Sequence, residues 1–141
     1  EALPAERKEL MAKALMILKI IEGINEFDGY AAENRGHLLL ENSDIAADNW
    51  REKAVDEFKK ALRFHPRQYR ARIGLARLLE KKGNLGDAVR LMNEGIGYYY
   101  ADELTGIGEF YQHAVKLNLM NGDTVKAREI QLDKRLLPVN Q

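Results

Sequence analysis

The chain has 141 residues, of which 45% are apolar and 31% are charged, and it contains no cysteine. This length is enough for one domain with its own core, and the missing cysteines exclude disulfides, thiolate catalysis and cysteine-ligated zinc. Lys plus Arg equals Asp plus Glu at 22 each, so the net charge gives no attraction toward nucleic acid or an anionic membrane.

The first predicted helix lies within residues 3–27. Apolar residues recur there every three or four positions, as they do along nearly the whole chain, which predicts helices and no strands. Pro4 is a residue favoured in the first turn of a helix, and Asp28-Gly29 is a turn signal. The apolar stretch from Ala14 to Ile24 is interrupted by charged residues, so it is too short for a bilayer. We expect it to be a buried helix face.

Six further helices are expected, separated by short turns that contain Gly, Pro, Asn or Asp. In chain order they span residues 30–41, 46 or 49 to 64, 68–82, 85–98, 108–120 and 124–136. The helix that ends at Phe64 stops there because the residue before Pro66 avoids helical geometry. Helices joined by such short turns pack antiparallel to their neighbours.

The sequence contains an internal repeat of about 34 residues. The second helix of the repeat has four characteristic positions, which are small, large, small, and proline or aromatic. In the first copy these are Ala54, Phe58, Ala61 and Pro66, and in the second they are Ala88, Met92, Gly95 and Tyr100. Ala127 begins a third copy. The first helix of the repeat carries a small or slim residue at Gly36, Ala76 and Val115. Small residues let two helices approach to about 8 Å while a bulky neighbour fills the groove. We therefore expect Phe58 to lie in the core.

The segment from Ala54 to Pro66 resembles the second helix of the tetratricopeptide repeat, a helix–turn–helix unit. The resemblance covers residues 30–137 and implies an all-α fold, an α-solenoid of antiparallel helix pairs. It divides the domain, residues 1–141, into units at 30–66, 69–100 and 108–139, with an N-terminal capping helix within 1–28. Two irregular joints, 45–50 and 98–107, depart from the repeat length, and Trp50 lies in the first.

The resemblance also implies a function. In this family the first helix of each unit lines a concave groove that holds a partner, so the chain would be a non-catalytic scaffold or adaptor for a protein or peptide. The corresponding groove residues are Tyr30, Glu33, Asn34, His37, Arg70, Ile73, Arg77, Glu109, Gln112 and Lys116. Arg70 and Arg77 lie two helical turns apart and could hold an acidic-apolar peptide through bidentate contacts. Glu33, His37 and Gly74 replace the lysines and asparagines of the chaperone-tail binders, so that partner is not expected.

The alternative is a structural or self-association role within a larger protein, which could be exported or membrane-anchored. An exposed apolar edge on the helix within 3–27 would favour it, because an uncapped solenoid end needs a partner. The arginines between 63 and 77 could also simply solvate the surface. Acidic neighbours interrupt any basic track, which argues against nucleic-acid binding.

Other candidate sites carry weaker signals. Glu109 and His113, four residues apart, are the residues that most resemble an acid–base or metal-binding pair. No metal-binding or cofactor motif accompanies them. We therefore expect no bound cofactor, no metal site and no enzyme activity. The tyrosines at 98–100 could form a partner surface or core. The missing initiator methionine suggests a processed or excised chain, and the compartment stays open between cytoplasm and periplasm or export.

Overall fold

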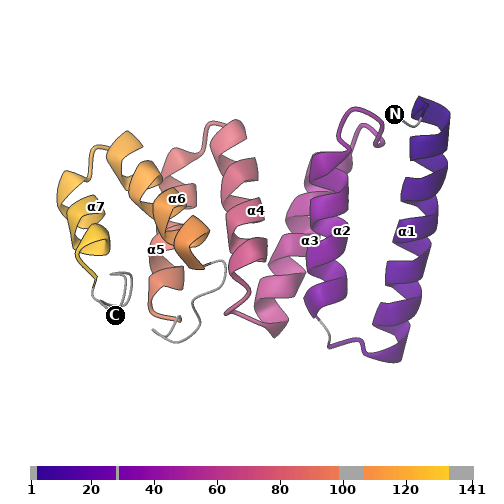
Figure 1. Cartoon of the computed structure of the whole chain (residues 1–141), viewed down its shortest axis with the longest axis horizontal. Coiled ribbons are helices and arrows are strands. Elements are labelled where there is room, and N and C mark those ends of the chain that lie inside the picture. The colour runs from indigo at the N-terminus through magenta and orange to yellow at the C-terminus, as the bar shows by residue number, and fades with distance from the viewer. Residues whose placement is uncertain (1–2, 28, 99–106, 134–141) are drawn as a thin grey trace, which may run out of the picture. The chain divides into compact units, whose positions relative to one another are not determined.

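The computed structural model describes residues 3–27, 29–98 and 107–133, which form seven helices and no strand (Figure 1). The helices are α1 (Pro4–Ile24), α2 (Gly29–Glu41), α3 (Trp50–Phe64), α4 (Tyr69–Lys81), α5 (Leu85–Ile96), α6 (Ile107–Met120) and α7 (Thr124–Gln131). Neighbouring helices pack against each other, and the expected all-α solenoid of antiparallel helix pairs is confirmed. The chain forms two compact units, Glu1–Leu75 and Ala76–Gln141, whose boundary falls within α4.

The core of the first unit is built around Phe58 of α3, whose side chain is completely buried. A Cβ atom added at Gly36 of α2 would lie 2.6 Å from the Phe58 ring, and one added at Gly74 of α4 would lie 2.4 Å from it. Both distances are far below van der Waals contact, so neither position can carry a side chain without moving the ring. The pattern predicted the small residue at Gly36, whereas the matching role of Gly74 was missed.

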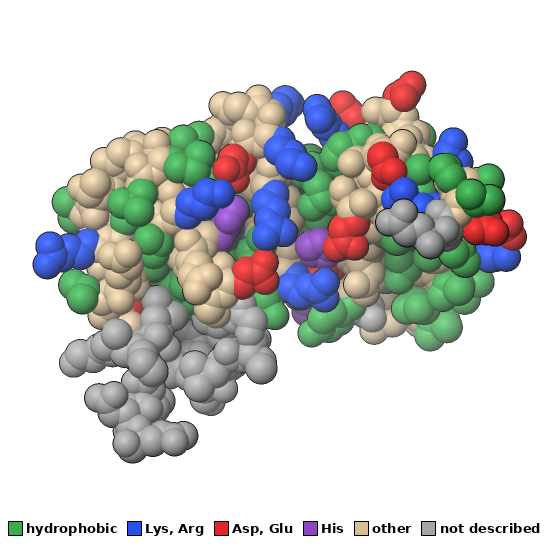
Figure 2. Space-filling view, turned by 45° about the horizontal axis from the view of Figure 1, so that its top comes forward, with side chains coloured by type: hydrophobic (Ala, Val, Ile, Leu, Met, Phe, Trp, Pro, Cys, Tyr) green, Lys and Arg blue, Asp and Glu red, His purple; other side chains and the backbone are tan. Residues whose placement is uncertain are grey.

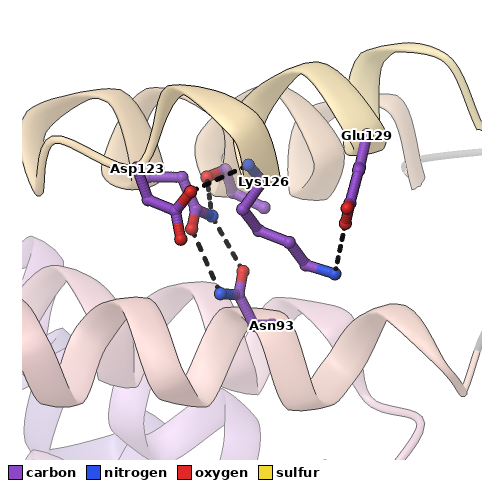
Figure 3. Close-up of polar contacts among 6 residues, drawn as sticks. Asn93, Asp123, Lys126 and Glu129 are labelled. Atoms are coloured by element: carbon purple, nitrogen blue, oxygen red, sulfur yellow. Dashed lines mark hydrogen bonds and ion pairs between the residues drawn. The ribbon is translucent and has the colours of Figure 1, made fainter.

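In the second unit, α5 and α7 begin with the same local arrangement. Gly83 and Gly122 have φ angles of +84° and +82°, a conformation that glycine adopts without steric cost. The next residues accept hydrogen bonds from backbone N–H groups three positions on. Asn84 accepts at 3.3 Å, and Asp123 accepts from Lys126 at 2.8 Å (Figure 3). These side chains satisfy donors that the first helical turn leaves free, and both predicted turns are confirmed.

A reciprocal amide pair joins α5 to α6 (Figure 3). Asn118 is completely buried, and its Nδ2 donates to the Asn93 Oδ1 at 2.8 Å, while the Asn93 Nδ2 donates to the Asn118 Oδ1 at 3.1 Å. The Asn118 Nδ2 also donates to the Ala114 carbonyl at 2.8 Å. A buried amide is tolerated only when it is paired in this way, so the pair fixes how the two helices face each other.

The expected burial of the apolar face of α1 is wrong. Met11 is its one buried residue among those described, while Ile20, Ile21 and Ile24 expose 59%, 41% and 82% of their surface. Figure 2 shows hydrophobic side chains gathered over α1, at the right of the view. Within the first unit, α1 packs against α2, so one side of the helix is covered and the other faces solvent.

Two predicted helix ends also differ from the structure. The fifth helix ends at Ile96 rather than at residue 98, and the seventh ends at Gln131 rather than at residue 136. Gln131 and Leu132 are exposed, so a longer α7 would bury nothing there, and Asp133 N–H instead bonds to the Ile130 carbonyl at 3.2 Å. Residues 99, 100 and 134–136 lie outside the described part of the chain.

Candidate partner-binding site

Three of the predicted groove residues meet at one pocket of the first unit. Asn34 and His37 of α2 and Arg70 of α4 line a pocket of about 360 Å³, together with side chains from α1 and the rest of α2. Its apolar lining comes from Ala14, Ile17, Leu18 and Leu38, and Glu41 also lines it. We call this the α1–α2 pocket. It combines an apolar wall with an amide, an imidazole and a guanidinium, which are groups able to orient a peptide.

A buried carboxylate supports Arg70. Glu33 is 4% exposed, and its carboxylate lies 3.8 Å from the Arg70 guanidinium. Burial raises the pKa of Glu33, and the charge of Arg70 and a hydrogen bond from the Ala71 backbone oppose that rise. The Arg70 side chain is 54% exposed, so Arg70 can meet a partner while Glu33 orients it from below.

The other predicted residues of the first unit have different surroundings. Tyr30 is 61% exposed, and its ring lies 5.9 Å from that of His65. The His37 ring packs edge-on against Phe58, with centroids 4.9 Å apart. Ile73 is 2% exposed and belongs to the core, because it lies on the inner side of α4. Ile73 and Glu33 therefore cannot serve as contact residues without a rearrangement.

In the second unit the predicted residues gather on α6 and the second half of α4. Arg77 donates to the Glu109 carboxylate at 3.1 Å, and both side chains are about half exposed. Gln112 and Lys116 are exposed. These four polar residues are all exposed, and the Arg77–Glu109 ion pair is of the solvent-exposed kind that contributes little stability.

Glu109 and His113 do not act as a pair in the structure. The His113 Nε2 lies 3.8 Å from a Glu80 carboxylate oxygen, whereas Glu109 bonds to Arg77. Burial lowers the pKa of His113, and the charge of Glu80 only partly opposes this effect. The charged form of the imidazole is therefore disfavoured, and the two side chains that sequence spacing suggested as an acid–base pair have separate partners.

Neither a metal centre nor a membrane-spanning helix is found in residues 3–27, 29–98 and 107–133. The His, Asp and Glu side chains of these segments form no group of three or more that could ligate an ion. Likewise, no helix there combines the length and the apolar character needed to cross a bilayer.

The pocket contains residues that the sequence analysis did not predict. Ala14, Ile17 and Leu18 come from α1, which the repeat pattern treats as a cap outside the binding units. The signal that could have found them is the three- and four-residue apolar period of α1 itself, which continues on the side that faces α2. Only the packing of α1 beside α2 shows that these side chains lie next to His37.

Comparison with known proteins bears on the repeat pattern. A search of curated proteins found no match. Residues 51–103 match the family model described as Tetratricopeptide repeat, a stretch that includes all of α3 but its first residue, with Phe58, and all of α4 and α5. Proteins of this family generally bind protein partners and are typically non-catalytic. This stretch of the chain is therefore similar to the tetratricopeptide repeat, in keeping with its helical repeats.

Proposed function

We propose that this protein is a non-catalytic scaffold that holds an acidic-apolar peptide of a partner protein. The observation that carries the proposal is the meeting of Asn34, His37 and Arg70 at the α1–α2 pocket, beside apolar side chains of α1. The apolar wall would take a large aliphatic or aromatic side chain of the peptide. The half-exposed Arg70 would bind its carboxylate through two parallel hydrogen bonds.

The polar groups of the pocket have distinct roles in this proposal. The Asn34 amide can both donate to and accept from a peptide backbone, which fixes the peptide's direction. Glu41, which also lines the pocket, would repel a carboxylate near it, so it selects where the acidic side chain of the peptide lies. The surface of Arg77, Glu109, Gln112 and Lys116 in the second unit is proposed as a further contact region.

Affinity capture of partner proteins from native extract tests the proposal. The wild-type protein is compared with the double variant Arg70→Glu, Arg77→Glu. We expect the variant to lose the partner by at least about tenfold in affinity, because reversed charges repel an acidic peptide. Arg51→Glu, Arg63→Glu is the matched control, since it makes the same charge change on exposed residues of α3. Circular dichroism checks that each variant is folded. Equal capture by all three proteins would contradict the proposal.

The exposed face of α1 favours a second candidate function, self-association. Leu10, Ile17, Ile21 and Ile24 follow one another at spacings of seven, four and three, which places them on one face of the helix. With Ile20 we call them the α1 stripe, and each exposes 41–82% of its surface. Their combined exposed area is on the order of the largest apolar patches of ordinary monomers, roughly 300–600 Å².

Sedimentation equilibrium tests this second candidate. If two copies pair through the α1 stripe, the wild type is a dimer and Ile17→Asn, Ile24→Asn is a monomer with unchanged helicity. Ile17 also lines the α1–α2 pocket, so Ile20→Asn, Ile24→Asn is measured alongside to separate pairing from peptide capture. A wild type that is monomeric at high concentration would exclude pairing through this face.

A further inference from the structure

A second concave surface of the first unit is separate from the α1–α2 pocket. Its lining comes from α1, α2, α3 and residues 45–47, and it encloses about 680 Å³. We call it the α1–α3 groove. None of the ten predicted partner-binding residues lines it. The extra residues at 45–50, which interrupt the repeat pattern, form part of its wall.

Ion pairs attach α1 to its neighbours at both ends of the groove. Near the start of α1, Arg7 bonds to Asp44 at 2.8 Å. Near its end, the Glu22 carboxylate forms ion pairs with Arg35 of α2, at 2.9 Å, and with Lys60 of α3. Between these two attachments α1 does not close onto α3, and the groove lies in the interval.

The middle of the groove is apolar. Met11 and Leu15 of α1, Leu39 of α2, and Ile45 and Trp50 line it. Met11 and Leu39 are buried, and the other three are partly exposed. Apolar surface left in water in this way favours a ligand that covers it.

The charged residues of the groove carry a positive excess, with five basic and three acidic side chains. Arg35, Lys60, Glu22 and Glu57 pair among themselves. The other charged residues of the groove are Lys8, Lys19 and Lys53, with Asp56 as the one acidic residue among them. The structure shows no ion pair for these three lysines among the described residues. Lys8 and Lys19 are eleven residues apart on one face of α1, about 16 Å along the helix. The lysines therefore offer anion-binding groups along the rim.

The shape and chemistry of the groove distinguish between possible occupants. A helix that spans Lys8 to Glu22 has a volume on the order of 1,600 Å³, more than twice the groove. An extended peptide would need hydrogen-bond partners for its backbone, and the apolar lining supplies none. An aliphatic chain needs no such partners, and its anionic end would meet the lysines.

We propose that the α1–α3 groove binds a long-chain fatty-acid anion, with the aliphatic chain on Met11, Leu15 and Leu39 and the carboxylate at the rim lysines. The chain would displace water from the apolar lining, and the carboxylate would accept hydrogen bonds from one or two of the ammonium groups. Arg35 would act from beneath by holding Glu22 and Glu57 away from the ligand, because both carboxylates are already paired with it.

Intrinsic fluorescence provides a direct readout, because Trp50 is the single tryptophan of the chain and lines the groove. The probe is dodecanoate, titrated below its micelle-forming concentration. We expect a saturable fluorescence change, with decanoate about 15-fold weaker because two fewer methylenes are buried. Dodecyltrimethylammonium, which has the same chain and the opposite charge, should cause no saturable change. Equal binding of the cation, or no saturation by dodecanoate, would overturn the proposal.

Matched variants locate the site. Lys8→Gln, Lys19→Gln, Lys53→Gln should weaken dodecanoate binding at least about tenfold. The control makes the same change in net charge away from the groove, at Lys13, Lys59 and Lys82, and should bind as the wild type does. Equal losses in the two triple variants would show a general charge effect and contradict the assignment.

Two further variants separate the groove from the α1 stripe. Ala12→Phe fills the groove from an exposed position that lines it, so the fold is retained while dodecanoate binding is lost. Ile20→Gln, Ile24→Gln changes the opposite side of α1 and should leave the affinity unchanged. The reverse result, loss with the isoleucine variant and retention with Ala12→Phe, would place the aliphatic chain on the stripe and refute the groove.

Discussion

Helices α1 and α3 of the first unit differ in how their apolar residues are used. α3 buries Ala54, Phe58 and Ala61 completely, with α2 on one side and Gly74 of α4 on the other. α1 is longer, with 21 residues against 15, yet Met11 is its one buried residue among those described. The two helices have the same apolar period, so the difference lies in the number of neighbours.

The comparison shows what holds each helix in place. α3 is fixed by close packing, in which a ring fills the space that two glycines leave. α1 is held by ion pairs at both ends. Arg7 pairs with Asp44 in the turn after α2, and Glu22 pairs with Arg35 of α2 and Lys60 of α3. Polar attachment of this kind leaves apolar surface free, and the proposed pocket, groove and stripe all lie on α1.

The largest expected effect is at the packed helix. Phe58→Ala should lower the free energy of unfolding by about 3–5 kcal/mol, because it leaves a cavity between α2 and α4. Urea denaturation measures the change as a lower midpoint at unchanged slope. Phe27→Ala, on a ring that is 64% exposed, is the control and should cost much less. An unchanged midpoint for Phe58→Ala would mean that the assigned core is wrong.

The next largest effect is at the ion pairs that attach α1. Arg35→Met should destabilise the protein by about 3 kcal/mol, because it removes the cation shared by Glu22 and Glu57, both largely buried. Arg7→Met breaks the more exposed pair with Asp44 and should cost at most about 1 kcal/mol. Urea unfolding of both variants tests the comparison. Similar costs would show that burial does not distinguish the two attachments.

The same ion pairs predict a dependence on pH. Arg35, and also Lys60, lower the pKa of Glu22 from 4.5 to about 2. The unfolded chain therefore takes up this proton first, and the stability that Glu22 contributes is lost as the pH falls from about 4.5 toward 2. Urea midpoints measured across this range should fall less steeply for Glu22→Gln than for the wild type. Glu9→Gln, on the exposed side of α1, should retain the wild-type slope.

Replacing a glycine by alanine should change the stability by a smaller amount, with opposite sign beside the packed Phe58 ring and in the open helix α1. Gly74→Ala should destabilise by about 1–3 kcal/mol, because its methyl group would overlap the Phe58 ring. Gly23→Ala in α1 should stabilise by up to about 0.5–1 kcal/mol, since alanine favours the helix and the added atom would meet nothing within 4 Å. Thermal unfolding of both variants provides the measurement. Destabilisation by Gly23→Ala would indicate that α1 is more closely packed than the structure shows.

The smallest effect is expected on the α1 stripe. Ile24→Gln should change the free energy of unfolding by no more than about 0.5 kcal/mol, because the side chain is 82% exposed. Chemical denaturation at low protein concentration, where self-association is absent, measures this value. A large loss of stability under these conditions would mean that Ile24 is covered in the monomer.

Much of the local structure could be predicted from the sequence. Glycine at Gly83 and Gly122 followed by a capping residue marked two turns, and Pro66 marked the end of α3. These signals are local, since they depend on backbone conformations and on hydrogen bonds within one helical turn. The repeated spacing around Phe58 likewise identified the core of α3 and the close approach at Gly36.

The candidate site was predictable only in part. The repeat pattern selected Asn34, His37 and Arg70, which share a pocket, but it also selected Glu33 and Ile73, which are buried. A helical period indicates which residues lie on one face and does not say how far the neighbouring helix covers that face. The burial of Glu33 depends on α4, which is more than thirty residues away along the chain.

The sequence by itself determined the helices, their turns and the repeat pattern, because those follow from local conformation and periodic packing. Only the tertiary structure decided which apolar faces are covered. It left α1 open on one side, joined Arg35 to Glu22 and Glu57 from three helices, and placed a groove between α1 and α3. The physical reason is that burial and ion pairing depend on neighbours distant in the chain, whereas helix formation depends on residues within a few positions.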